Sequence, residues 1–105
     1  VDLGSINPIT SISTGFLQDW NAWIFMPESV TYYGSDDGVN FTNLGVVLNS
    51  VDEKEADVVL QNFTLKTNIK NRYIKVIAKN RKYNPEWHRA PGDICWIFAD
   101  EISIN

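Results

Sequence analysis

The sequence predicts an all-β domain, a β-sandwich or jelly roll of about seven short strands joined by turns. The stretch Ser29–Phe41 shows the pattern most clearly, because an alternating strand with Val30 and Tyr32 on one face runs into the turn Asp36-Asp37-Gly38. Phe41 is then expected to return to the core. Nowhere do apolar residues recur at the helical spacing after a capping residue, so no helix is predicted.

The other strands are expected where β-branched and aromatic residues alternate with polar ones. Breaks between them are expected at Ile6–Pro8 and Thr67–Asn71. Asn49–Asp57 is predicted to form an acidic turn with Glu53 in a solvated bend. Asn80–Cys95 is predicted to be a long irregular loop, and loops of this length are often functional. The expected strands are Val1–Gly4, Ile9–Phe16, Leu44–Leu48, Val58–Leu65, Arg72–Lys79 and Trp96–Ile104.

A length of 105 residues fits one domain, residues 1–105, with a single modest core. No apolar run approaches the roughly 20 residues that a membrane-spanning helix needs. No secretion signal opens the sequence, so any such signal is expected in an earlier segment. Val1 stands in place of an initiator methionine, which suggests processing or excision from something larger.

The charge balance argues against nucleic acid as a partner. The net charge is −4, and binding to phosphates requires clustered basic residues. The basic run from Lys66 to Arg81 is interrupted by apolar residues. We interpret it as the solvent-exposed face of a strand. Cys95 is the single cysteine, so it can form no disulfide within the chain, and a buried position is expected for it.

Catalysis is disfavoured by the placement of the acidic residues. Asp100 and Glu101 are neighbours in a predicted strand and point to opposite faces, so they cannot act on one substrate together. The pair Asp36 and Asp37 lies in a turn, where aspartate is favoured for its own backbone hydrogen bonds. His88 has no serine in a Gly-x-Ser-x-Gly motif as a partner.

Two loops, Gln18–Trp23 and Asn80–Cys95, combine flat aromatic rings with hydrogen-bonding side chains. Sugars require this combination of chemistry. Loops at one end of a sandwich often form one binding surface. Trp23 is the better core candidate in the first loop, and in the second Trp87 could equally plug the end of the sandwich. The candidate ligand-binding residues are Gln18, Trp20, Asn21, Trp87, His88 and Arg89.

Four motifs in order, covering nearly the whole chain, resemble the F5/8 type C (discoidin) domains, also grouped as family 32 carbohydrate-binding modules. They are Val1–Gly4, Ser35–Phe41, Arg72–Val76 and Trp96–Ile102. The loop Pro85–His88 before the last strand is most similar to the C-terminal module of bacterial β-N-acetylhexosaminidases, or chitobiases.

The resemblance implies a galactose-binding-like jelly roll that binds glycans and is not itself catalytic. It implies a secreted, periplasmic or cell-surface bacterial location and a neighbouring glycoside hydrolase domain. In this family Val1–Gly4 would follow a first strand and a loop with most ligands of a structural calcium ion, and these are absent here. Glu101 lies where the family often has its C-terminal calcium ligand. Gln18 and Asn21 lie in a loop where galactose-binding members carry arginine and asparagine. Because the arginine is missing, amino sugars or glycan chains stay open as ligands in place of galactose.

Two other functions stay open. Relatives of this fold insert hydrophobic loop tips into membranes, and Trp20 and Phe25 could act as such tips, although the negative net charge weighs against anionic lipid and makes a membrane partner less favoured. Protein adhesion belongs to the same alternative. A purely structural spacer packed on a catalytic domain would instead bury both tryptophan loops.

Overall fold

The computed structural model describes all 105 residues and confirms the all-β fold. The strands pair in the order β3-β2-β4-β1-β5, and every pair is antiparallel. A short 3-10 turn, η1, is the helical element. The bounds are β1 Asp2–Gln18, η1 Trp20–Ala22, β2 Ser29–Ser35, β3 Thr42–Leu48, β4 Val59–Lys79 and β5 Phe98–Ile104.

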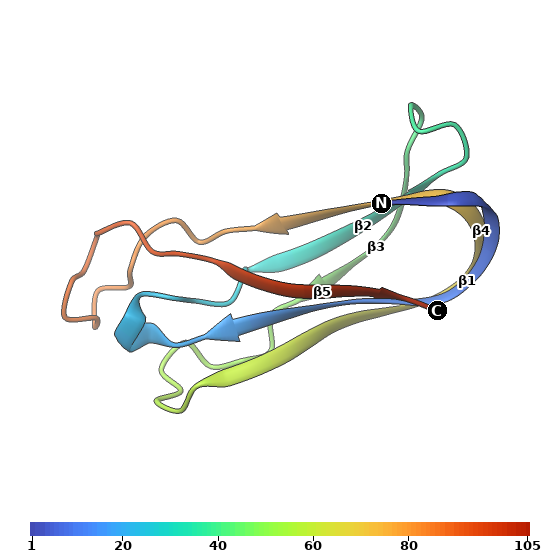
Figure 1. Cartoon of the computed structure of the whole chain (residues 1–105). Helices are drawn as coiled ribbons and strands as arrows, with labels where there is room; N and C mark the ends of the chain where they lie inside the picture. Colours follow the sequence, from blue (N-terminus) through green and yellow to red (C-terminus); the bar gives the residue numbers. More distant parts are fainter.

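Two long strands, β1 and β4, bend together and fold the sheet into two layers (Figure 1). The first part of β4, residues 59–66, pairs with residues 11–18 of β1, to which β5 is added. The last part of β4, residues 73–79, pairs with β2, which in turn pairs with β3. The result is a sandwich in which β4 belongs to both layers.

The expected breaks at Ile6–Pro8 and Thr67–Asn71 are wrong, because β1 and β4 continue through both segments. Their mutual pairing shifts register between Asp2 and Asn7 and again between Ile9 and Ser11. Such irregularities let a strand pair bend sharply without ending it. The polar residues that look like a turn in the sequence are therefore the outer side of a bend.

The core lies between the two layers and is built from side chains that alternate along the strands. Val30 and Tyr32 are fully buried on one face of β2, as the sequence predicts. Phe41 does not return to the core; it is half-exposed, with its ring centroid 4.7 Å from Lys75 Nζ. The buried cluster comprises Ile9, Ile12, Phe16, Met26, Val30, Tyr32, Phe63 and Ile74. Cys95 is also buried, as expected, and burial raises the pKa of its thiol.

The turn after β2 is held by one carboxylate. Asp37 accepts hydrogen bonds from the backbone N–H groups of Val39 and Asn40, each at 2.8 Å, and from the side chains of Ser35 and Asn40. Gly38 adopts φ +74°, a conformation that favours glycine. The Asp-Asp-Gly turn is thus a scaffold element.

Three connections meet at one end of the sandwich, called here the loop end. The register requires this, since Ser29 pairs with both Leu48 and Lys79, while Gln18 pairs with Val59. The segments 19–28, 49–58 and 80–97 therefore leave from neighbouring strand ends, at the left of Figure 1. No helix in the structure has the length and apolar character needed to cross a membrane.

Candidate functional site

The two tryptophan loops predicted to form one surface do lie together at the loop end. The rings of Trp20 and Trp87 meet edge to face, with centroids 5.3 Å apart, and Trp87 also packs against Phe25 at 6.2 Å. The Trp20 indole N–H donates to the Glu55 carbonyl oxygen at 2.7 Å, and that of Trp87 donates to Glu53 Oε1 at 3.0 Å. Both rings stay partly exposed, with their single donors engaged within the protein.

His88 joins the two loops from inside. It is 3% exposed, and its Nε2 lies 2.6 Å from the Trp20 carbonyl oxygen. Its Nδ1 accepts the N–H of Ala90 at 3.0 Å, so Nε2 carries the proton and donates to Trp20. His88 was predicted to contact a ligand. Both of its ring nitrogens instead form hydrogen bonds within the protein, and these bonds hold the two loops in place.

Arg89 and Asn21 form the exposed rim of the same surface. Arg89 Nη1 donates to Asn21 Oδ1 at 3.2 Å, and Nη2 donates to the Asn21 backbone carbonyl oxygen. Both side chains are exposed. A guanidinium fork that is only partly used can still donate to a ligand hydroxyl.

The acidic connection 49–58 contributes a group that the sequence reading missed. Glu53 is not in a solvated bend; it is partly buried and its Oε2 accepts a bond of 2.6 Å from Arg81 Nη1. Arg81 also donates from Nε to the Tyr83 carbonyl oxygen and lies 5.0 Å above the Phe25 ring. The bond from Arg81, followed by that from Trp87, lowers the pKa of the Glu53 carboxyl.

A polar pocket of about 220 Å³ opens beside this ion pair. Gln18 lies at its base, 1% exposed, and donates from Nε2 to the Asp52 carbonyl oxygen at 2.9 Å. The carboxylates are acceptors, the guanidinium is a donor and the amides are both, so the wall can match several hydroxyl groups. The polar pocket is lined by Gln18, Phe25, Met26, Glu28, Asn49, Glu53 and Arg81.

Other aromatic positions differ from expectation. Phe25 is 2% exposed beneath Arg81 and Trp87, so it cannot serve as a lipid-inserting tip. Trp23 is partly buried and caps the 3-10 turn with φ +64°, outside the core. The most exposed tryptophan is Trp96, at 66%, which the sequence placed in the last strand. That strand begins two residues later, at Phe98.

Glu101, the predicted calcium ligand, is exposed on β5. No group of three or more His, Cys, Asp or Glu side chains gathers anywhere in the structure. Calcium in proteins takes six to eight oxygen ligands. The acidic side chains of this chain therefore do not enclose a calcium site by themselves.

Comparison with known proteins agrees with the fold. A family model for the F5/8 type C domain matches residues 1–91, which include β1 to β4 and most of the loop end. No match to the chain is found among curated proteins. The chain belongs to the F5/8 type C domain family, whose members are binding modules, commonly for carbohydrates or adhesion, and usually non-catalytic.

Proposed function

We propose that this domain is a non-catalytic carbohydrate-binding module whose ligand occupies the loop end. The observation that supports this most directly is the polar pocket, because the Glu53 carboxylate that lines it also accepts the indole N–H of Trp87, whose ring packs on Trp20. A sugar offers C–H faces that pack on aromatic rings and hydroxyl groups that need fixed polar partners. Both kinds of partner are adjacent here.

The roles divide according to exposure. Glu53 and Arg81 line the polar pocket with Gln18, and their mutual ion pair fixes the direction of their free lone pairs and N–H groups. The exposed edges of Trp20 and Trp87 provide apolar contact, and Asn21 with Arg89 provides the rim. His88 acts through the loops that it holds.

The wider context is also a proposal. The similarity of the Pro85–His88 loop to that of chitobiase modules supports an accessory role beside the catalytic domain of a secreted or periplasmic bacterial glycoside hydrolase. A structural calcium ion would require Glu101 to be joined by ligands other than the acidic side chains of this chain.

The test is a glycan array followed by titration of the domain, observed by NMR. A shallow single-sugar site is expected to bind with Kd of about 0.1–1 mM, or about −4 to −5.5 kcal/mol, so sugar must be added to millimolar concentration. Glu53→Gln should weaken binding at least tenfold, since it removes the charge that orients Arg81. Asp36→Asn, in the turn at the opposite end, is the matched control and should bind normally.

Chemical shift changes should cluster around residues 18–25, 49–55 and 80–89. The proposal fails if no glycan shifts these resonances at millimolar concentration. It also fails if the shifts map to the Asp37 turn, or if Glu53→Gln keeps both its fold and its full affinity.

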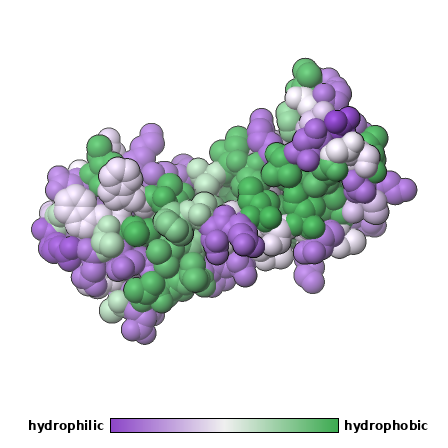
Figure 2. Space-filling view, in the orientation of Figure 1, coloured by the Kyte–Doolittle hydropathy of each residue, from purple (hydrophilic) through white to green (hydrophobic).

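A second candidate, packing against a neighbouring protein domain, is favoured by an apolar patch on the outer face of the β1 layer. Leu17 pairs with both Leu60 and Phe98, and the last two are 65% and 51% exposed. Figure 2 shows a hydrophobic area where β5, β1 and β4 run side by side. If this face is normally covered, the isolated domain should self-associate through it. Light scattering would then detect association that Leu60→Asp abolishes, whereas a monomeric wild type would reject the idea.

A further inference from the structure

The polar pocket at the loop end offers a ligand more hydrogen-bond acceptors than donors. Asn49 is engaged within the protein, because its Nδ2 donates to the Val51 carbonyl oxygen at 3.0 Å and its Oδ1 accepts the Val51 N–H at 2.9 Å. Gln18 donates from Nε2 to Asp52, and its Oε1 accepts no bond. The fully buried side-chain atom without a partner is Asn84 Oδ1, so Gln18 Oε1 is open to the pocket that Gln18 lines.

Arg81 carries the side-chain nitrogen of the lining that has no bond to the protein. Its Nε donates to the Tyr83 carbonyl oxygen and its Nη1 donates to Glu53, which leaves Nη2. Each Glu53 oxygen accepts one bond, from Arg81 or from Trp87, and keeps a second lone pair. The wall therefore presents one uncommitted donor group among several acceptors.

Glu28 adds a second carboxylate to the lining, and it is the more available of the two. Lys79 Nζ lies 3.1 Å from Glu28 Oε2, and Glu28 Oε1 has no partner. The Lys79 and Glu28 side chains are 72% and 52% exposed, and an ion pair this exposed contributes little and opens readily. The pair shows that Glu28 can receive an alkylammonium group at the edge of the pocket.

The charge of the lining has the same preference. Two carboxylates face one guanidinium, and Lys79 is not part of the lining, so the wall is net negative, as is the whole chain at −4. A negative cleft attracts cationic ligands and repels anionic ones. An ammonium group brings a positive charge and three N–H donors with no acceptor, which matches the wall in both respects.

We propose that the polar pocket selects a sugar unit that carries a free, protonated amine, with Glu28 receiving the ammonium group. This selectivity rests on the proposed carbohydrate-binding function and specifies its ligand class. N-acetylation would remove the charge and replace three N–H donors by one N–H and a carbonyl acceptor. A uronic acid would bring a negative charge towards Glu28 and Glu53. The ligand class is therefore hexosamines without acetyl groups, or oligosaccharides built from them.

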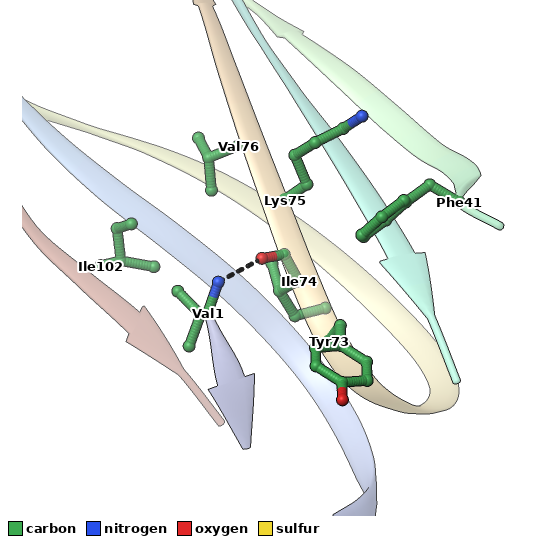
Figure 3. Close-up of a pocket in the computed structure, with 7 residues that line it drawn as sticks. All are labelled: Val1, Phe41, Tyr73, Ile74, Lys75, Val76 and Ile102. Carbon is green, nitrogen blue, oxygen red and sulfur yellow. Dashed lines mark hydrogen bonds between the residues drawn. The ribbon is translucent and has the colours of Figure 1, made fainter. Parts of the chain in front are cut away.

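The largest pocket of the structure, of about 390 Å³, has the opposite character. Its lining is apolar apart from Lys75 and the Tyr73 hydroxyl, and it includes Val1, whose amino group donates to the Ile74 carbonyl oxygen at 2.8 Å (Figure 3). Two cationic groups and no carboxylate belong to this lining. An amine-bearing sugar should therefore perturb the loop end and leave the residues around Ile74 unchanged.

Sugars that differ at one substituent test the selectivity. The methyl glycosides of glucose, glucosamine, N-acetylglucosamine and glucuronic acid, with their galacto counterparts, are titrated at pH 6 and followed by NMR. The amine is protonated there, since amino groups of this kind have a pKa of about 8. The amino sugar should bind about threefold or more tightly than its neutral parent, because charge-assisted hydrogen bonds are the stronger ones. The N-acetyl and uronic acid forms should bind more weakly than the amino sugar.

Two variants should change this preference in opposite directions. Glu28→Gln should make the affinities for the amino sugar and its neutral parent equal. Lys79→Met should increase the preference, because it removes the ammonium group that competes for Glu28. Glu86→Gln is the matched control, since Glu86 is exposed at the loop end and does not line the pocket, and it should keep the wild-type preference.

The outcomes separate this selectivity from the function on which it rests. Equal affinities for amino and neutral sugars, or a preference that survives Glu28→Gln, would overturn the selectivity and leave carbohydrate binding intact. If no sugar shifts the loop-end resonances at millimolar concentration, carbohydrate binding itself is wrong and the selectivity with it. A preference for the amine that Glu28→Gln abolishes and Glu86→Gln keeps is the supporting result.

Discussion

Glu53 and Arg81 stand 28 positions apart in the sequence, yet their side chains meet at 2.6 Å, between Oε2 and Nη1. The contact joins the β3–β4 connection to the β4–β5 connection and forms one wall of the polar pocket. The remaining carboxylate oxygen receives the Trp87 indole. One carboxyl group therefore ties the ion pair to the aromatic rings.

Glu53→Gln should destabilise the fold by about 0.5–1 kcal/mol at pH 7, a modest value because the Glu53 side chain is 44% exposed. The folded state lowers the pKa of this carboxyl from its ordinary 4.5, chiefly through the bond from Arg81. The stabilisation that the Glu53 carboxylate gives the fold is therefore complete above about pH 4.5. It is lost as the pH falls through the lowered pKa of the folded state. Urea unfolding at pH 7 and pH 3 should show the difference between variant and wild type shrinking in acid; a constant difference would contradict this.

Asp37→Ala should reduce the free energy of unfolding, measured as a lower melting temperature, by more than it reduces the free energy of ligand binding. The side chain accepts four hydrogen bonds that close the turn after β2. These bonds, the backbone bond from Asn40 first, hold the pKa of the carboxyl well below 3.8, so the stabilisation is present above that pH and fades below it. Asp36→Ala removes a single bond to Asn71 and serves as the control in thermal melts. A variant with native melting temperature and lost binding would assign Asp37 to the ligand site.

Tyr32→Phe should cost about 1–3 kcal/mol, because it leaves a buried carbonyl oxygen without its partner. The Tyr32 hydroxyl donates to the Phe63 carbonyl oxygen at 2.6 Å and lies 3.0 Å from Thr14 Oγ1. Tyr33 points to the other face of β2 and has no such bond, so Tyr33→Phe should be nearly neutral. Similar unfolding midpoints for the two variants in denaturant would argue against the buried bond.

His88→Leu should destabilise the loop end by about 1–3 kcal/mol and abolish binding indirectly. The change removes the partner of the Ala90 N–H and leaves the Trp20 carbonyl oxygen with the Trp23 N–H as its remaining donor. Arg89→Ala, on the exposed neighbour, should cost about 1 kcal/mol or less. Denaturant unfolding measures the costs, and NMR should show perturbed resonances in both tryptophan loops for His88→Leu. Native spectra for that variant would show that His88 does not hold the loops.

Local patterns were sufficient for much of the fold. Alternation predicted the β class and the inward face of β2, and the Asp-Asp-Gly turn was recognisable because its hydrogen bonds join residues at most three positions apart. The breaks in β1 and β4 were misplaced, since polar residues in a turn and on the outside of a bend are alike in sequence. Only the pairing of the two strands shows that both run through the bend.

The site shows the same division. The sequence by itself determined the all-β class, the absence of a long helix and the two tryptophan loops, all of which depend on residue types and short spacings. Only the tertiary structure decided that Phe25 and His88 are buried, that Arg81 meets Glu53, and that Glu28 lines the same pocket. These facts depend on which distant segments lie side by side, and that is fixed by strand register and packing rather than by any local pattern.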